Sequence, residues 1–130
     1  MNGTDYLVDS NYIIYFSKGD KQIATFFEEV QRRRNKLYIS VITYLEVWGY
    51  WNLSDEEKEF LNTIRPAFIT IPLSLKIADK AIFLRQNMKI KLADAVIAAT
   101  ALVHGLSLVT NNIDDFKNIQ NLNLLNIISK

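Results

Sequence analysis

The sequence predicts an α/β protein, in which helices cover both faces of a parallel β-sheet. Short apolar runs alternate along the chain with longer segments that carry apolar residues at helical spacing. Such alternation indicates that each strand leads into a helix and each helix into the next parallel strand. The 130 residues, 49% of them hydrophobic, suffice for one domain with a buried core and are too few for two. We therefore expect a single domain over residues 1–130.

The first part of the chain predicts two strands, each followed by helical segments. Tyr6–Val8 has the pattern of a short buried strand, and Asn11–Phe16 that of a short helix or turn. Asp20 can accept hydrogen bonds from the free amides at a helix start. A second strand is expected at Leu37–Ser40, followed by a helix over Val41–Trp51. The helix after Asp20 places apolar residues at helical spacing at Ile23, Phe26, Phe27 and Val30.

The middle of the chain carries a clear helix start. Ser54 and Glu57 have the spacing of a capping box, in which each side chain bonds the other residue's backbone amide. This helix should reach about Arg65, because the following proline cannot continue it. Phe68–Ile71 is then the third strand.

The last part of the chain predicts two helices and two strands. Ser74 can cap the first helix, and the second covers Ala93–Val103 and ends at Gly105, where a left-handed conformation is needed. Leu106–Val109 and Leu124–Ile128 are the last strands. The helix after Ser74 has its expected apolar side at Ile77, Ala78, Ala81, Ile82 and Leu84.

Composition excludes several classes of site. There is no cysteine, and the single histidine, His104, lies in the last turn of a helix, where a dipole partner is expected. Zinc sites of the usual kind and a Ser/His/Asp triad therefore have little support. The four glycines form no phosphate-binding loop. The lack of cysteine is compatible with the cytoplasm, where we expect the protein.

Net charge and hydropathy limit the kinds of partner and the possible membrane segments of the protein. The formal net charge is +1, so a strong basic field over the whole surface is missing. Local basic groups remain at Arg32–Arg34 with Lys36, which fit a solvated helix end, and at Lys89 and Lys91, which precede Asp94 and can face a substrate phosphate. The N-terminus has no basic stretch of the kind that signal peptides carry, and no apolar run approaches the ~20 residues of a membrane span.

Acidic and amide side chains stand at four places where a strand meets a helix: Asp9, Glu46, Asp94 and Asn112. A parallel sheet brings the carboxyl ends of its strands to one edge, where ligands bind at the switch point of strand order. Carboxylates gathered at one point need a divalent cation, and a cation held in this way does phosphate chemistry.

Each of the four residues also has a structural explanation. Asp9 can cap the next helix, Glu46 can lie on a narrow exposed face, and Asn112 can form a turn. Asp94 can stabilise a helix start, but its helix is apolar on nearly every face, so an ionised group there needs a partner.

Taken together, the four places resemble the PIN-domain ribonucleases, and specifically the VapC toxins of VapBC toxin–antitoxin pairs. The resemblance spans essentially the whole chain, and the segments occur in the same order and spacing. The matching segments are Tyr6–Asn11, Ser40–Val47, Lys91–Ala101 and Leu108–Phe116.

The resemblance implies a three-layer α/β/α fold with a central parallel sheet of about five strands. It implies Asp9, Glu46 and Asp94 as metal-binding acids, with Asn112 at the family's fourth acidic position and Asp115 at that of a further acid. An amide at position 112 adds no charge, which leaves open whether one or two metals bind. Supporting positions in the site are Ser10, Thr43 and Thr110.

The function implied is that of an endoribonuclease toxin that uses Mg²⁺ or Mn²⁺ and is neutralised by a cognate VapB-like antitoxin. The aromatic residues Tyr44, Trp48 and Trp51 form a helical stripe that fits either core packing or an interface. From this stripe and the resemblance we expect a homodimer that also binds an antitoxin segment.

Two other functions stay open. The first is a non-catalytic interaction module whose acids are structural. The second is a receiver-like phosphoacceptor domain, which is disfavoured because Asp9 is not part of an acidic pair and Leu124–Ile128 contains no lysine.

Overall fold

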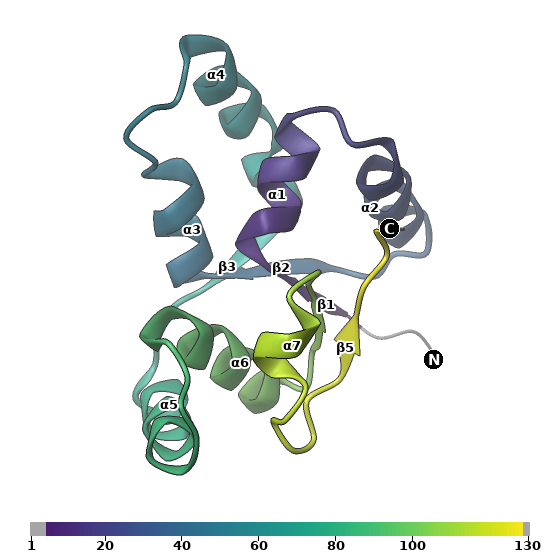
Figure 1. Ribbon diagram of the computed structural model, residues 1–130. Helices are drawn as coiled ribbons and strands as arrows, with labels where there is room; N and C mark the ends of the chain where they lie inside the picture. The colour runs from purple at the N-terminus through teal and green to yellow at the C-terminus, as the bar shows by residue number, and fades with distance from the viewer. Residues whose placement is uncertain (1–4, 129–130) are drawn as a thin grey trace.

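A computed structural model describes residues 5–128 of the chain. Its five strands form one sheet in which every neighbouring pair is parallel, in the order β3-β2-β1-β4-β5. The sheet is therefore the parallel α/β arrangement that the sequence predicts (Figure 1). The strands are β1 (Tyr6–Val8), β2 (Leu37–Ser40), β3 (Phe68–Ile71), β4 (Ser107–Val109) and β5 (Leu124–Leu125).

Helices cover both faces of this sheet. The helices α1 to α4 lie on one face and α5 to α7 on the other, which gives three layers (Figure 1). None of the helices in residues 5–128 is both long and apolar enough to cross a membrane. The helices are α1 (Ser10–Ser17), α2 (Lys21–Arg32), α3 (Val41–Trp48), α4 (Asp55–Ile64), α5 (Leu75–Asn87), α6 (Leu92–His104) and α7 (Ile113–Phe116), with a short 3₁₀ turn η1 (Arg65–Ala67) before β3.

The strands divide the core into two halves because successive side chains point to opposite faces of a sheet. On β1, Leu7 belongs to the cluster under α5 and α6, whereas Val8 belongs to the cluster under α1 and α2. Leu108 and Val109 of β4 divide in the same way. This alternation explains why strands of only three residues read as continuous apolar runs.

The strand order has one switch point. The chain moves outward from β1 through β2 to β3, then returns to the other side of β1 to form β4 and β5. β1 and β4 are therefore neighbours whose following loops diverge. In open parallel sheets this point, at the carboxyl ends of the strands, is where ligands bind.

Most predicted elements are found, with corrections at several ends. The predicted helix Val41–Trp51 ends at Trp48, because Gly49 follows in a conformation where an added Cβ would collide with the Leu45 carbonyl oxygen. The predicted last strand, Leu124–Ile128, is only Leu124–Leu125. The turn expected around Asn112 continues into α7.

Two expectations about burial and termini also have outcomes. Ile82, predicted on the apolar side of its helix, is 53% exposed, whereas Ile77, Ala81 and Leu84 are buried as expected. The absence of a signal peptide was predicted from the N-terminal residues, the first four of which lie outside the described part of the chain.

Candidate active site

Asp9 lies at the end of β1 and is the most buried acid of the predicted site, with 5% of its surface exposed. It is the N-cap of α1, and its Oδ1 accepts a hydrogen bond from the Ser10 amide at 2.8 Å. Its Oδ2 accepts a second bond from the Thr110 hydroxyl at 2.7 Å. Capping therefore uses one carboxylate oxygen, and the other is fixed across the switch point.

Thr110 follows β4 and links Asp9 to the next turn. Its hydroxyl is fully buried, donates to Asp9 and accepts from the Asn112 amide at 3.0 Å. The same hydroxyl thus fixes the orientation of the Asp9 carboxylate and the position of the backbone at the start of α7. This positions Thr110 as the supporting residue that the sequence predicts.

Glu46 reaches the same place from α3. Its side chain is exposed, and its Oε1 accepts a hydrogen bond from the Ser10 hydroxyl at 2.8 Å. The same Ser10 hydroxyl lies 3.2 Å from the hydroxyl of Thr43, which is buried one turn before Glu46. Ser10 therefore contacts two acids, because its backbone amide donates to Asp9 and its hydroxyl donates to Glu46, and its hydroxyl also contacts Thr43.

Asp94 lies in the first turn of α6 and is partly buried. Burial raises the pKa of its carboxyl, and the negative charges of Asp9, Asp115 and Glu46 raise that pKa further. Lys91, one turn earlier, is the one group among the causes that lowers it by charge. Asp94 is thus under the field of three other acids.

The pKa of Asp9 is raised as well. Burial is the main cause, and the charges of Glu46 and Asp115 add to it, while the hydrogen bonds from Thr110 and Ser10 lower the pKa in part. The same neighbouring carboxylates, Glu46 and Asp115, therefore raise the pKa values of both Asp9 and Asp94. Negative charge is concentrated at this edge with little compensation from the protein.

Asp115 contributes negative charge at this edge. The sequence analysis gave Asn112 the fourth position and Asp115 a supporting one. Burial is the main cause of the raised pKa values of Asp9 and Asp94, and the charges of Glu46 and Asp115 both add to it. Asn112 is the N-cap of α7, its backbone amide binds Thr110, and its side chain makes no capping bond. Asp115 lies one helical turn later, at the position that the family resemblance assigned to a further acid.

Next to Asp94 the surface is hollowed and basic on one side. A hollow of about 550 Å³ is lined by the carboxylates of Asp94 and Asp115 and by both predicted phosphate-facing residues, Lys89 and Lys91. Arg85, which the sequence reasoning missed, lines it too and lies in the last turn of α5, shortly before Lys89 in the loop that follows. We call this the basic hollow.

The remaining predicted groups lie away from the acids. Arg32 ends α2 and Lys36 precedes β2, so this basic run lies where β2 begins, at the edge opposite the acids. His104 lies in the last turn of α6, at the end opposite Asp94, and is exposed. The fold therefore supports a solvated helix end for the basic run and a role as helix-dipole partner for His104.

The donor set fits a hard cation rather than zinc. Carboxylate, amide and hydroxyl oxygens surround the site, without cysteine or histidine. No three acidic, histidine or cysteine side chains in residues 5–128 stand close enough to share one ion. Mg²⁺ is usually bound through one or two carboxylates with water and substrate phosphate, so a dedicated cage of three acids is not required for it.

The aromatic stripe is interrupted. Tyr44 and Trp48 pack on each other with ring centroids 5.4 Å apart, and the Arg65 guanidinium lies 4.5 Å from the Tyr44 ring centre. Trp51, beyond the end of α3, is 85% exposed. Core packing therefore explains Tyr44 and Trp48, and Trp51 stands apart from them.

Comparison with known proteins agrees with this fold. The family model of the PIN domain matches residues 6–122. The Ribonuclease VapC1 of Rickettsia felis is 30% identical over 138 aligned positions, which cover 95% of this chain and 97% of the relative.

Solved structures give the same result. A toxin–antitoxin complex from Klebsiella pneumoniae is 28% identical with a TM-score of 0.78, covering 97% of this chain and 100% of that one. The crystal structure of VapBC2 from Rickettsia felis bound to a promoter DNA fragment is 27% identical with a TM-score of 0.82, covering 93% and 97%. The chain belongs to the PIN-domain family and, within it, to the VapC proteins.

Proposed function

We propose that this protein is a metal-dependent endoribonuclease that acts as the toxin of a VapBC pair. The observation that carries the proposal is the gathering of four carboxylates at the switch point of the sheet, where two of them have raised pKa values. A divalent cation would offset this concentration of negative charge. The ribonuclease name of the Rickettsia felis relative supports RNA as the substrate.

Different residues of the chain would bind the cation and position its ligands. Asp9, Glu46 and Asp94 would hold Mg²⁺ or Mn²⁺ in part through bound water, because the three carboxylates are too far apart to share one ion directly, with Asp115 contributing charge and Asn112 an amide oxygen. When bound, the cation would lower the pKa of a water and stabilise negative charge on the phosphate. Ser10 and Thr110 keep the carboxylates of Glu46 and Asp9 in place by hydrogen bonds of 2.8 and 2.7 Å.

The basic hollow provides a path for the RNA backbone. Arg85, Lys89 and Lys91 stand on the wall of the hollow that Asp94 also lines, so a phosphate held by these cations lies next to the acids. A local patch of this kind compensates for the overall charge of only +1.

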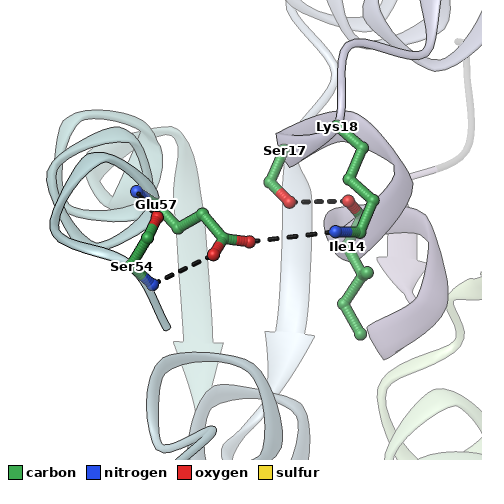
Figure 2. A network of polar contacts seen from close by, with 5 residues as sticks. All are labelled: Ile14, Ser17, Lys18, Ser54 and Glu57. Atoms are coloured by element: carbon green, nitrogen blue, oxygen red, sulfur yellow. Dashed lines mark hydrogen bonds and ion pairs between the residues drawn. The ribbon is translucent and has the colours of Figure 1, made fainter. Parts of the chain in front are cut away.

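An apolar groove beside Glu46 is the proposed place for the antitoxin. A hollow of about 230 Å³ lies between α1, α3 and α4, with Ile14, Val47 and Leu61 among its lining residues and Glu46 at its margin. Lys18 of α1 reaches Glu57 of α4 at 3.9 Å and joins the two walls (Figure 2). An antitoxin segment with apolar residues and a basic group would fill the groove and neutralise Glu46. Two of the similar structures are a toxin–antitoxin complex and a VapBC complex, which supports such a partner.

The nuclease proposal is tested by comparing the wild type with Asp94→Asn on single-stranded and structured RNAs. We expect cleavage with Mg²⁺ or Mn²⁺, no cleavage in EDTA, and a loss of about 100-fold or more in the variant, because a metal-assisted step contributes several kcal/mol. Asp79→Asn, the same change on the exposed face of α5, should retain full activity. Calorimetric titration with Mn²⁺ should show binding to the wild type and weaker binding to Asp94→Asn.

One result would refute this function. Cleavage that survives both EDTA and the Asp94→Asn change would show that the acids are not a metal site. Absence of cleavage and of Mn²⁺ binding in the wild type would favour the non-catalytic interaction module.

A further inference from the structure

A second hollow, of different chemistry, adjoins the acids. It has a volume of about 330 Å³, close to the lower limit of roughly 300 Å³ for small-ligand sites. It lies where the chain leaves β4 and β5, and it shares two carboxylates with the basic hollow. We call it the amide hollow; its lining residues are Asn111, Asn112, Ile113, Asp114, Asp115 and Asn126.

Asn126 is held in one orientation. The Tyr12 hydroxyl donates to Asn126 Oδ1 at 2.6 Å and accepts from the Ile127 amide at 2.9 Å, while the Ile128 amide donates to the same Oδ1 at 3.1 Å. Two donors on Oδ1 fix which end of the amide is the oxygen. The side chain of Tyr12 is fully buried, so this anchor is rigid. Asn126 Nδ2 has no partner in residues 5–128 and is left as a free donor.

Asn111 has an unmet hydrogen-bonding capacity. Its Nδ2 makes one long bond of 3.4 Å to the Tyr15 hydroxyl, and its Oδ1 is buried without a partner among the described residues. Turning the amide over would exchange the two atoms and still leave one of them unpaired. A buried polar atom without a partner is unfavourable, and a ligand that pairs with the amide would relieve it.

The lining indicates the class of ligand. Among residues 5–128 no lysine or arginine lines the amide hollow, and Asp114 and Asp115 would repel a phosphate. Neutral amides offer a donor and an acceptor each, which matches the edge of a nucleobase, and Ile113 adds an apolar surface. The hollow is also linked directly to the acids, because the Asn112 amide binds the Thr110 hydroxyl that binds Asp9.

We propose that the amide hollow binds one unpaired nucleobase of the RNA next to the cleaved bond, and that Asn126 Nδ2 donates to an acceptor on its edge. The proposal rests on the nuclease function proposed above, since it names how that site selects its substrate. The basic hollow would hold the backbone while the amide hollow reads a base.

The test is Asn126→Asp. This change keeps an oxygen for Tyr12 and for the Ile128 amide, replaces the free donor by an acceptor and adds one negative charge. Single-stranded RNAs that vary one nucleotide at a time around the cleaved bond are cut in Mg²⁺. We expect the wild type to prefer one base at one position, and the variant to lose that preference by roughly 10-fold, the value of one hydrogen bond. Preferences at other positions should remain.

Controls separate charge and folding from recognition. Asn123→Asp makes the same change at the exposed residue before β5 and should alter all RNAs alike. Asn111→Ala, which removes the other amide, should weaken the same preference, and thermal unfolding checks that both variants fold.

The outcomes distinguish the two proposals. Cleavage with no base preference in the wild type, or with a preference that Asn126→Asp leaves unchanged, overturns the amide hollow and leaves the nuclease intact. The affinity of the same RNAs, measured by fluorescence anisotropy in EDTA, is the second readout. A base preference in binding that Asn126→Asp removes, with no cleavage by the wild type, would support the amide hollow and refute the nuclease.

Discussion

At the scale of single residues, the acids of the site work against the stability of the protein without metal. Asp9 and Asp94 have raised pKa values because they are buried and because neighbouring carboxylates repel them. Each ionised group is therefore less stable in the folded chain than in the unfolded one. Such a conflict between stability and charge is typical of a functional site rather than of a structural cap.

This conflict predicts that Asp94→Asn unfolds at a higher temperature than the wild type in EDTA. A raised folded pKa means that the folded state binds protons more tightly, so this contribution to stability is present below about pH 4 and is lost as pH rises through the folded pKa. The advantage of the variant should therefore be small at pH 4 and reach about 0.5–2 kcal/mol at pH 7, as for other relieved functional charges. Thermal unfolding at both pH values measures it.

With Mg²⁺ present, the wild type should unfold at a higher temperature than Asp94→Asn. The wild type gains stability from a bound ion, whereas the variant gains less, because only the native state holds the site. An Asp94→Asn protein that is less stable than the wild type at pH 7 without metal would contradict the interpretation of the raised pKa.

Thr110 gives a second prediction at this scale. Thr110→Val removes the donor to Asp9 and the acceptor of the Asn112 amide, while keeping the shape of the side chain. We expect a loss of about 1–3 kcal/mol in the free energy of unfolding, because buried groups lose their partners. The pKa of Asp9 should rise further, since the Thr110 bond lowers it, and the acid limb of the cleavage profile should move to higher pH.

Thr100→Val is the matched control for this change. Thr100 is equally buried, but its hydroxyl donates to the Val96 carbonyl within α6, where backbone amides are regular partners. Its substitution should leave the pH profile unchanged. An equal shift in both variants would show that packing, not the bond to Asp9, sets the profile.

The sequence located three of the acids but not their relative importance. Asp9, Glu46 and Asp94 follow strands or open helices, so sheet topology alone brings them together. Asp115 was named from the family resemblance alone, because the four residues of α7 carry too little periodicity to predict its placement. The amide hollow was also beyond prediction, because it depends on Tyr12 holding a segment that is more than 110 residues away in the chain.

At the scale of elements, helix ends decide the shape of the proposed antitoxin groove. The sequence predicted the start of α4 from Ser54 and Glu57, and the capping box is present, with bonds of 3.0 and 3.1 Å. The predicted end of α3 lies too far along the chain. The apolar periodicity continues to Trp51, whereas the helix ends at Trp48 with Gly49 as its C-cap. A helix end that is capped by a side-chain hydrogen bond can be predicted from the local sequence. An end that is set by backbone geometry alone is harder to predict.

Ser54→Ala tests the capping box. The change should reduce the free energy of unfolding by about 1 kcal/mol, the usual value of an N-cap. Because α4 forms one wall of the apolar groove, binding of an apolar, basic peptide should weaken, while RNA cleavage should be unchanged. Lys18→Ala removes only the exposed ion pair at 3.9 Å and should alter stability much less. A larger effect from Lys18 would mean that the ion pair, not the cap, positions α4.

At the scale of the whole molecule, the helices shield the sheet but leave one face apolar. The outer face of α5 and its surroundings expose Leu75 at 78%, Ile82 at 53%, Phe83 at 54% and Leu92 at 64%. Exposed apolar side chains in such numbers on one side are typical of an interaction surface.

We therefore expect the homodimer to form through α5 rather than through the aromatic residues of α3. Light scattering of the wild type should give twice the 15.0 kDa of the chain, and Ile82→Lys should give the monomer, because a charge would be buried in the contact. Ile82 is already half exposed, so the variant should keep its fold. Trp51→Lys, which places the same charge at the end of the predicted stripe, should remain a dimer. A monomeric Trp51→Lys together with a dimeric Ile82→Lys would place the interface on α3 instead.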